Sequence, residues 1–127
     1  MAYLTLRIMI NALSIAMAVT LIDDITFTGE WWKMIIIGAV FGLVNSLIKP
    51  FITIFALPLI ILTLGLFTLI VNALMLTITA KLSGPLSLGL QIIGFWAAFK
   101  GALIISMVSI LLSWVTGLKK IKIYRNK

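Results

Sequence analysis

Long apolar runs, broken only at a few points by charged residues, are the feature that most restricts what this chain can fold into. The first run covers residues 3–22 and contains one charge, Arg7. Twenty helical residues rise about 30 Å, which matches the hydrocarbon core of a bilayer, so the run predicts a transmembrane helix. A cleaved signal peptide is the alternative, because residues 16–18 resemble a cleavage site. The thin charged region and Asn11 within the apolar run favour a retained helix.

Composition extends this conclusion to the whole chain. Of 127 residues, 63% are hydrophobic and 10% are charged, whereas soluble domains are about half apolar and a quarter charged. A soluble chain of this size could not bury so much apolar surface, so the surplus must face lipid. The chain is therefore predicted to be an all-α integral membrane protein, with one transmembrane domain over residues 1–118 and a basic tail over residues 119–127.

Charges, glycines and prolines divide the apolar sequence into four predicted spans, at residues 3–22, 31–48, 66–82 and 91–115. The segment between the second and third spans contains Pro50 and Pro58, which cannot continue a regular helix. We therefore expect a broken, re-entrant or interfacial segment around residues 50–65. One long kinked helix is the alternative.

Short matches suggest that two helical hairpins form a tandem repeat. The matched segments lie at offsets of 58, 61, 64 and 63 residues. They are Leu4-Thr5-Leu6 with Leu62-Thr63-Leu64, Asn11-Ala12-Leu13 with Asn72-Ala73-Leu74, Trp31-Trp32 with Phe95-Trp96, and Gly38-Ala39 with Gly101-Ala102. Such a repeat predicts two hairpins in the same orientation, related by an axis along the membrane normal.

The charge distribution predicts the orientation. Four spans place both termini on one side, together with Arg7, Lys49 and the tail cations Lys119, Lys120, Lys122, Arg125 and Lys127. The opposite side holds Lys33, Lys81 and all the acids. The positive-inside rule then places both termini in the cytoplasm of a bacterium, in its inner membrane. The net charge of +7 is thus assigned to anionic lipid head groups, which the tail should contact, and not to nucleic acid.

The residues needed for most catalytic and metal sites are missing. The sequence has no cysteine and no histidine, and its three acids, Asp23, Asp24 and Glu30, lie in one short stretch. This composition lacks the usual ligands of zinc, haem and iron–sulfur clusters and the usual nucleophile–base pairs. We therefore predict a protein that is not an enzyme and binds no cofactor.

Small residues recur every four positions in two of the predicted spans. They are Gly38, Gly42 and Ser46 in the second span, and Gly94, Ala98, Ala102 and Ser106 in the fourth. Such spacing lets helix backbones approach closely, either within one chain or between copies in a homo-oligomer.

Four polar residues lie inside apolar runs. Amides such as Asn11, Asn45 and Asn72 need partners in hydrocarbon, as interhelical contacts or along a substrate or ion path. Lys100 lies nine residues after Gln91, near the middle of the fourth predicted span. Its ammonium either snorkels to the interface or marks a wet cavity that attracts anions.

Residues 42–76 carry a more specific pattern. It reads Asn-x-Leu-x-Lys-Pro, then Leu-Pro, then Leu-Thr-Leu-Gly-Leu-Phe, then Asn-Ala, and its marked positions are Asn45, Lys49, Pro50, Pro58, Thr63, Gly65 and Asn72. The pattern resembles a family of small bacterial membrane proteins, phage holin superfamily IV of the four-transmembrane, YvlD type. The resemblance implies four spans and a holin, a protein that assembles into membrane lesions to release a phage lysin. Lys100 departs from the family pattern, where an apolar residue is expected.

Three functions follow as hypotheses. The first is a holin-like protein that self-associates through its small-residue faces. The second is a non-lytic envelope protein that binds lipid or a partner under stress. The third is a small channel or transporter that uses the repeat axis and Lys100.

Overall fold

The computed structural model describes residues 2–116, which form five helices and one two-stranded sheet. The predicted head-group residues of the tail, Lys119 to Lys127, lie outside the described residues. The elements in chain order are α1 (Ala2–Leu21), β1 (Ile25–Phe27), α2 (Trp31–Leu47), α3 (Lys49–Leu62), α4 (Phe67–Ser83), β2 (Leu90–Ile92) and α5 (Phe95–Val115).

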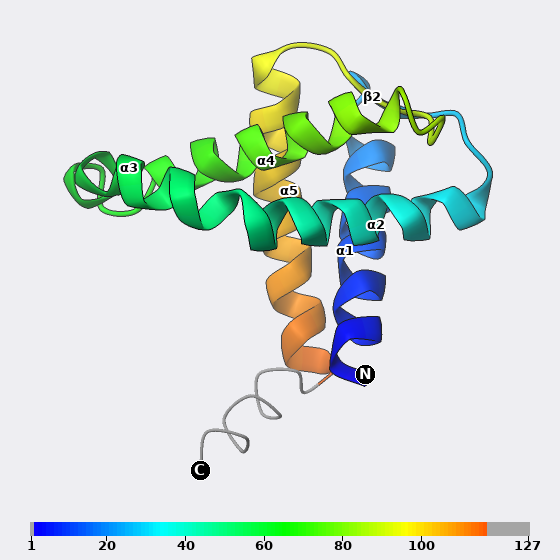
Figure 1. Ribbon diagram of the computed structural model, residues 1–127, viewed down its shortest axis with the longest axis horizontal. Helices are drawn as coiled ribbons and strands as arrows, with labels where there is room; N and C mark the ends of the chain where they lie inside the picture. Colours follow the sequence, from blue (N-terminus) through cyan, green and yellow to red (C-terminus); the bar gives the residue numbers. More distant parts are fainter. Residues whose placement is uncertain (1, 117–127) are drawn as a thin grey trace.

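The helices form two crossed pairs (Figure 1). Helices α1 and α5 lie side by side and run in opposite directions, and α2 and α4 cross them at a wide angle. Helix α1 packs against α2 and α5, and α4 packs against α5 and α2. The start of α1 and the end of α5 lie at one end of their pair, and the sheet lies near the other end.

Helix length and hydropathy identify the membrane-crossing segments. Helices α1 and α5 are each long and apolar enough to cross a bilayer. Helices α2 and α3 meet this requirement together but are bent by 58°, and α4 is a shorter apolar helix of 17 residues. The chain is therefore an all-helical membrane protein with two clear spans and a bent pair.

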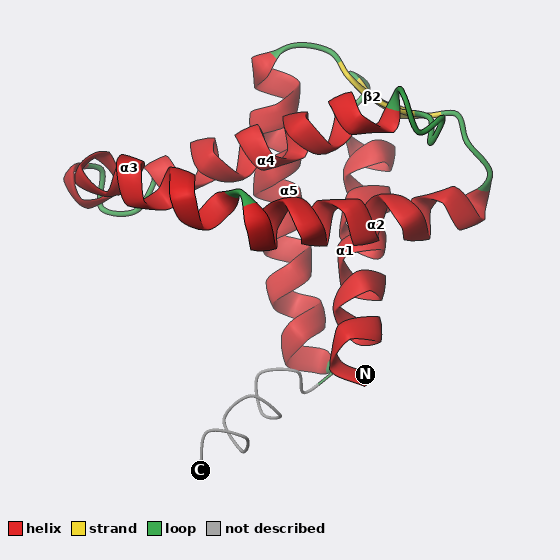
Figure 2. Cartoon of the chain, viewed as in Figure 1, coloured by secondary structure: helices red, strands yellow, loops and turns green. Residues whose placement is uncertain are grey.

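The bend between α2 and α3 has a local cause at Pro50. The N–H of Ile48 still donates to the carbonyl of Val44 (2.9 Å), which ends α2. Proline has no N–H, so the carbonyl of Ser46 loses the donor it would have four residues later. Regular bonding resumes when the N–H of Ile52 donates to Ile48 (3.3 Å). Figure 2 shows this interruption as a short non-helical segment.

A tight turn ends α3 and reverses the chain into α4. The N–H of Gly65 donates to the carbonyl of Ile60 (2.7 Å), and that of Leu64 donates to Ile61 (3.2 Å). This pair of bonds is the Schellman arrangement, whose left-handed position glycine usually occupies. Here Leu64 occupies it, with φ of 57°, and its side chain is 95% exposed.

The sequence did not predict the small antiparallel sheet. Strand β1 pairs with β2 in the register Ile25 with Ile92, Thr26 with Gln91 and Phe27 with Leu90. The predicted fourth span began at Gln91, and this start is wrong by four residues. Because the backbone of β2 forms hydrogen bonds with β1, these residues are not helical and α5 begins only at Phe95.

The core lies where the helices cross. Ile15, Ile37 and Met75 are completely buried there. Gly38 allows α1 and α2 to approach closely, because a Cβ at this position would lie 2.8 Å from the Ala12 nitrogen. Large apolar side chains are exposed over the outer surface, as expected of a lipid-facing protein.

Candidate functional site

A polar cavity of about 100 Å³ lies between α1, α2, α4 and α5, toward the end that holds the chain termini. Its walls include the apolar residues Phe41, Ala102 and Ile105. Its polar lining consists of Arg7, Asn11, Asn45, Lys49, Asn72, Ser106 and Ser109. All three asparagines singled out in the sequence therefore meet at one place.

Two of the asparagines are tied to neighbouring helices. The side-chain nitrogen of Asn11 donates to the carbonyl of Gly38 across the α1–α2 contact (3.4 Å). The side-chain nitrogen of Asn72 donates to the hydroxyl of Ser106 across the α4–α5 contact (3.4 Å). Both bonds are long, so each is a weak tether that positions the amide.

Asn45 differs from the other two asparagines. Its side-chain oxygen Oδ1 is buried, and no group among the described residues donates a hydrogen bond to it. A buried acceptor without a donor costs free energy, so this position is suited to a ligand that supplies an O–H or N–H.

The charges of the cavity are all positive. Arg7 and Lys49 are both partly buried, and no carboxylate lines the cavity in the described part of the chain. The acid closest to Arg7 in the sequence is Asp23, which follows the far end of α1. It is sixteen residues from Arg7, which corresponds to about 24 Å along a helix axis. Because the Coulomb interaction falls with distance, an acid so far away does little to balance the cavity.

A larger groove of about 310 Å³ runs between α1 and α2 and shares Arg7, Asn11 and Asn45 with the polar cavity. The other groove-lining residues are mainly apolar: Leu4, Ile8, Ala39, Gly42 and Leu43, with Ser46. Leu4 and Leu43 are more than half exposed, so the groove opens to the lipid-facing surface. The two spaces together offer a charged, polar end and an apolar trough.

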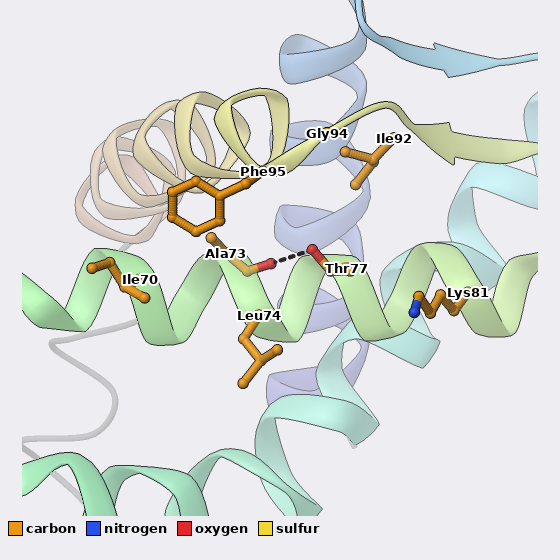
Figure 3. A pocket seen from close by; sticks show the side chains of 8 residues that line it. All are labelled: Ile70, Ala73, Leu74, Thr77, Lys81, Ile92, Gly94 and Phe95. Carbon is orange, nitrogen blue, oxygen red and sulfur yellow. Dashed lines mark hydrogen bonds between the residues drawn. The ribbon is translucent and has the colours of Figure 1, made fainter.

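A third space, of about 470 Å³, lies between α4 and the start of α5 (Figure 3). Phe95, Ala73 and Ile92 give it mostly apolar walls, and Lys81 lies toward one end. The hydroxyl of Thr77 donates to the carbonyl of Ala73 (2.9 Å), so its hydrogen is already used within α4. This space is an apolar crevice with little to orient a polar ligand.

Lys100 lies apart from these spaces. It is exposed, and it occupies the second turn of α5, because that helix begins at Phe95. Its side chain is not part of the polar cavity. This location is nearer the helix end than the mid-span position expected from the sequence, and a lysine stem can reach the interface from there.

The small residues of the sequence pattern are distributed over several contacts. Gly38 packs against α1, and Gly42 lines the groove with Ser46. Ala98 and Ala102 are buried beside Ala73 of α4. Ser106 accepts the bond from Asn72, whereas Gly94 precedes α5 and is exposed, with φ of 87°.

The remaining motif positions shape the backbone. Pro50 lies at the bend, and Pro58 lies inside α3. The hydroxyl of Thr63 donates to the carbonyl of Leu59 (2.8 Å) and accepts from the N–H of Phe67 (3.0 Å), which links α3 to α4. Gly65 adopts a φ of 93° in the same turn.

Sequence reasoning counted Arg7 only as an orienting charge and missed its place in the cavity. A usable signal was present, because Arg7 and Asn11 are four residues apart and so share a helix face. Asn45, near the end of α2, and Lys49, at the start of α3, have the same spacing. Ser109 of α5 carried no such signal.

Comparison with known proteins decides the family. The family model described as "Mycobacterial 4 TMS phage holin, superfamily IV" matches residues 2–111, nearly the whole chain. The chain belongs to phage holin superfamily IV. This confirms the resemblance predicted from residues 42–76, and the holin family consists of membrane proteins and not of enzymes.

Two curated relatives of this holin-family chain come from bacteria. An uncharacterized protein of Streptomyces coelicolor is 48% identical over 104 residues, covering 78% of this chain and 83% of the relative. The uncharacterized membrane protein YvlD of Bacillus subtilis is 35% identical over 105 residues, covering 83% and 85%. No solved structure matches this holin-family chain.

Proposed function

We propose that the protein is a holin-like protein of the bacterial cytoplasmic membrane that acts by self-association in the bilayer. Its membership of the holin family is the observation that carries this proposal. The lytic outcome that the family name implies is part of the proposal. Expression of the chain in a bacterial host should slow growth and admit a membrane-impermeant dye. Normal growth and dye exclusion at high expression would contradict the lytic role.

The packing favours a particular surface for self-association. Gly38, Ala98 and Ala102 are buried within the chain and are not free to contact a second copy. Helix α3 instead exposes large apolar side chains, with Phe55 at 85% and Leu62 at 78%, and Ala56 is its only buried residue. We therefore place the contact between copies on α3.

Cysteine cross-linking tests this surface directly, because the natural sequence has no cysteine. Phe55→Cys should form an oxidised dimer in native membranes. The matched control is Val115→Cys, at an apolar position of α5 that is 83% exposed, which should stay monomeric. Equal cross-linking of the two variants would indicate random collision and contradict the α3 contact.

We also propose that both termini are cytoplasmic. The support is the distribution of cations, because Arg7 and Lys49 lie together toward the terminal end while the acids lie near the sheet. Reporter fusions at the C-terminus and in the loop over residues 23–30 should report opposite sides. Reports from one side would contradict the arrangement.

We infer further that the two halves are a tandem repeat. Three features support this inference. Each half is a helix, a short strand and a helix, namely α1–β1–α2 and α4–β2–α5. The strands pair around Thr26 and Gln91, at an offset of 65 that is close to the offsets of 61 and 64 of the sequence matches on either side. Asn11 and Asn72, matched in the sequence, both bond across the helix pair of their own half.

A non-lytic, lipid-binding role is the second candidate. The observation that favours it is the cationic cavity joined to an apolar groove. Under this role, deletion of the gene should sensitise cells to envelope stress, while high expression should not release a dye. The dye measurement therefore separates the two candidates.

A further inference from the structure

Two cationic side chains share one cavity without a carboxylate to neutralise them among the described residues. They are Arg7 of α1 and Lys49 at the start of α3. Like charges that share a partly dehydrated space repel each other, because the surrounding protein and lipid screen them less than water does. An anion placed between the two cations would convert this repulsion into attraction.

The donors and the size of the cavity define the anion. A guanidinium and an ammonium together provide the forked and the rotatable donors that bind phosphate in proteins. The cavity volume of about 100 Å³ admits one tetrahedral oxyanion or a few water molecules, but not a bulky organic acid. The buried oxygen of Asn45 accepts no bond from the described residues, so a hydroxyl group carried beside the phosphate would satisfy it.

The adjoining groove favours a lipid over a free phosphate. It shares Arg7 and Asn45 with the cavity, and it is otherwise lined mainly by apolar residues, of which Leu4 and Leu43 are exposed to lipid. An apolar trough that leads away from a phosphate-sized cavity matches an amphiphile, whereas free phosphate would use only the cavity.

We propose that the Arg7–Lys49 cavity binds the phosphate of an anionic phospholipid and that the groove between α1 and α2 holds part of one acyl chain. This inference rests on the lipid-binding role named above as the second candidate function. A zwitterionic choline lipid also carries a phosphate, but its trimethylammonium group would approach two cations. The site therefore favours a lipid with net negative charge and a hydroxyl-bearing head group, such as phosphatidylglycerol.

The test uses the full-length protein in neutral detergent. Thermal unfolding is followed while phosphatidylglycerol, phosphatidylcholine or inorganic phosphate is added, and bound lipid is counted by native mass spectrometry. The site variants are Arg7→Gln and Lys49→Gln. The matched control is Lys100→Gln, which removes the same charge from an exposed position of α5. Every variant keeps the tail cations, so any nonspecific attraction of anionic lipid by the tail is the same in all the proteins compared.

Phosphatidylglycerol should raise the unfolding temperature of the parent and of Lys100→Gln. Each site variant should bind it at least about tenfold more weakly, as expected for loss of one charge-assisted hydrogen bond. Equal lipid binding by all variants would overturn the proposal, because the two cations would then act only as general interfacial charges. If Arg7→Gln does not fold, Lys49→Arg and Lys49→Gln provide the comparison, with binding kept only by the arginine.

A groove variant separates the two sources of phosphate. Ala39→Phe fills the groove without changing a charge, and Leu111→Phe adds the same ring at an exposed position of α5. Loss of phosphatidylglycerol binding in Ala39→Phe alone supports the lipid. Stabilisation by inorganic phosphate that Ala39→Phe leaves unchanged would overturn the lipid assignment in favour of a free anion.

The lipid-binding inference and the proposed functions can fail independently, because different measurements test them. Dye entry on expression and cross-linking at α3 report self-association and lysis, and they do not depend on the cavity. A lytic protein with site-specific lipid binding would contradict the non-lytic role but preserve this inference. A non-lytic protein without site-specific lipid binding would contradict this inference but preserve the non-lytic role.

Discussion

Substitution of Gly38 by alanine should separate α1 from α2. The added Cβ would lie 2.8 Å from both the Ala12 nitrogen and the Ile8 oxygen, where ordinary contact begins at 3.4 Å. These neighbours are backbone atoms and cannot rotate away, so the helices must move apart by about 0.6 Å or more. The same movement would lengthen the bond from Asn11 to the Gly38 carbonyl, which is already 3.4 Å.

Overpacking of this kind costs about 1–3 kcal/mol, and the better helix propensity of alanine returns about 0.5–1 kcal/mol. We therefore expect Gly38→Ala to lower the free energy of unfolding by about 1–2 kcal/mol. The assay is unfolding in detergent, followed by tryptophan fluorescence and circular dichroism.

Gly84→Ala is the matched control. Its Cβ would meet only the Lys81 oxygen, at an ordinary 3.6 Å, and the one added cost comes from Pro85, which disfavours a helical conformation of the alanine before it. This variant should therefore lose less stability than Gly38→Ala. If Gly38→Ala proves equally stable, the close approach of α1 and α2 does not hold the fold together and the reasoning fails.

Three further substitutions test other parts of the structure by the same unfolding assay. Leu64→Gly should stabilise the protein by about 1 kcal/mol, because glycine adopts the left-handed conformation without a Cβ clash, and an unchanged stability would refute this. Ser83→Ala should cost about 1–3 kcal/mol and speed amide exchange at Leu90, whose N–H donates to the Ser83 hydroxyl (2.9 Å); unchanged exchange would count against it. Lys100→Leu should give a gain below about 1 kcal/mol, because an exposed lysine in the second turn of α5 already reaches the interface, and a loss of stability would indicate a partner for its charge.

The apolar runs were sufficient to predict a helical membrane protein, because hydrocarbon admits few other structures for a chain of this composition. The motif around Asn45 and Pro50 was sufficient to predict the family. The missing N–H of Pro50 indicated a break after the second span, and the structure bends there, between α2 and α3. The broken segment expected over residues 50–65 is wrong for most of its length, because α3 is helical over Lys49–Leu62 and contains Pro58.

Other features depend on how segments distant in sequence meet. Strands β1 and β2 have three residues each, too few for a periodic signal, and their paired residues are 63 to 67 positions apart. That pairing delays the start of α5 and moves Lys100 toward the helix end. Asn11, Asn45 and Asn72 could each be recognised as polar groups in need of partners, but only the crossing of the helix pairs brings them to one cavity.

The pairing of β1 with β2 also restricts the order in which the chain can be assembled. Residues 25–27 leave the ribosome long before residues 90–92, and the two segments can bond only once both lie on the same face of the membrane. A chain whose two strand segments end on opposite faces of the membrane cannot form these bonds. The sheet therefore forms late in biogenesis, and its backbone bonds stabilise only chains that have completed insertion with the correct topology.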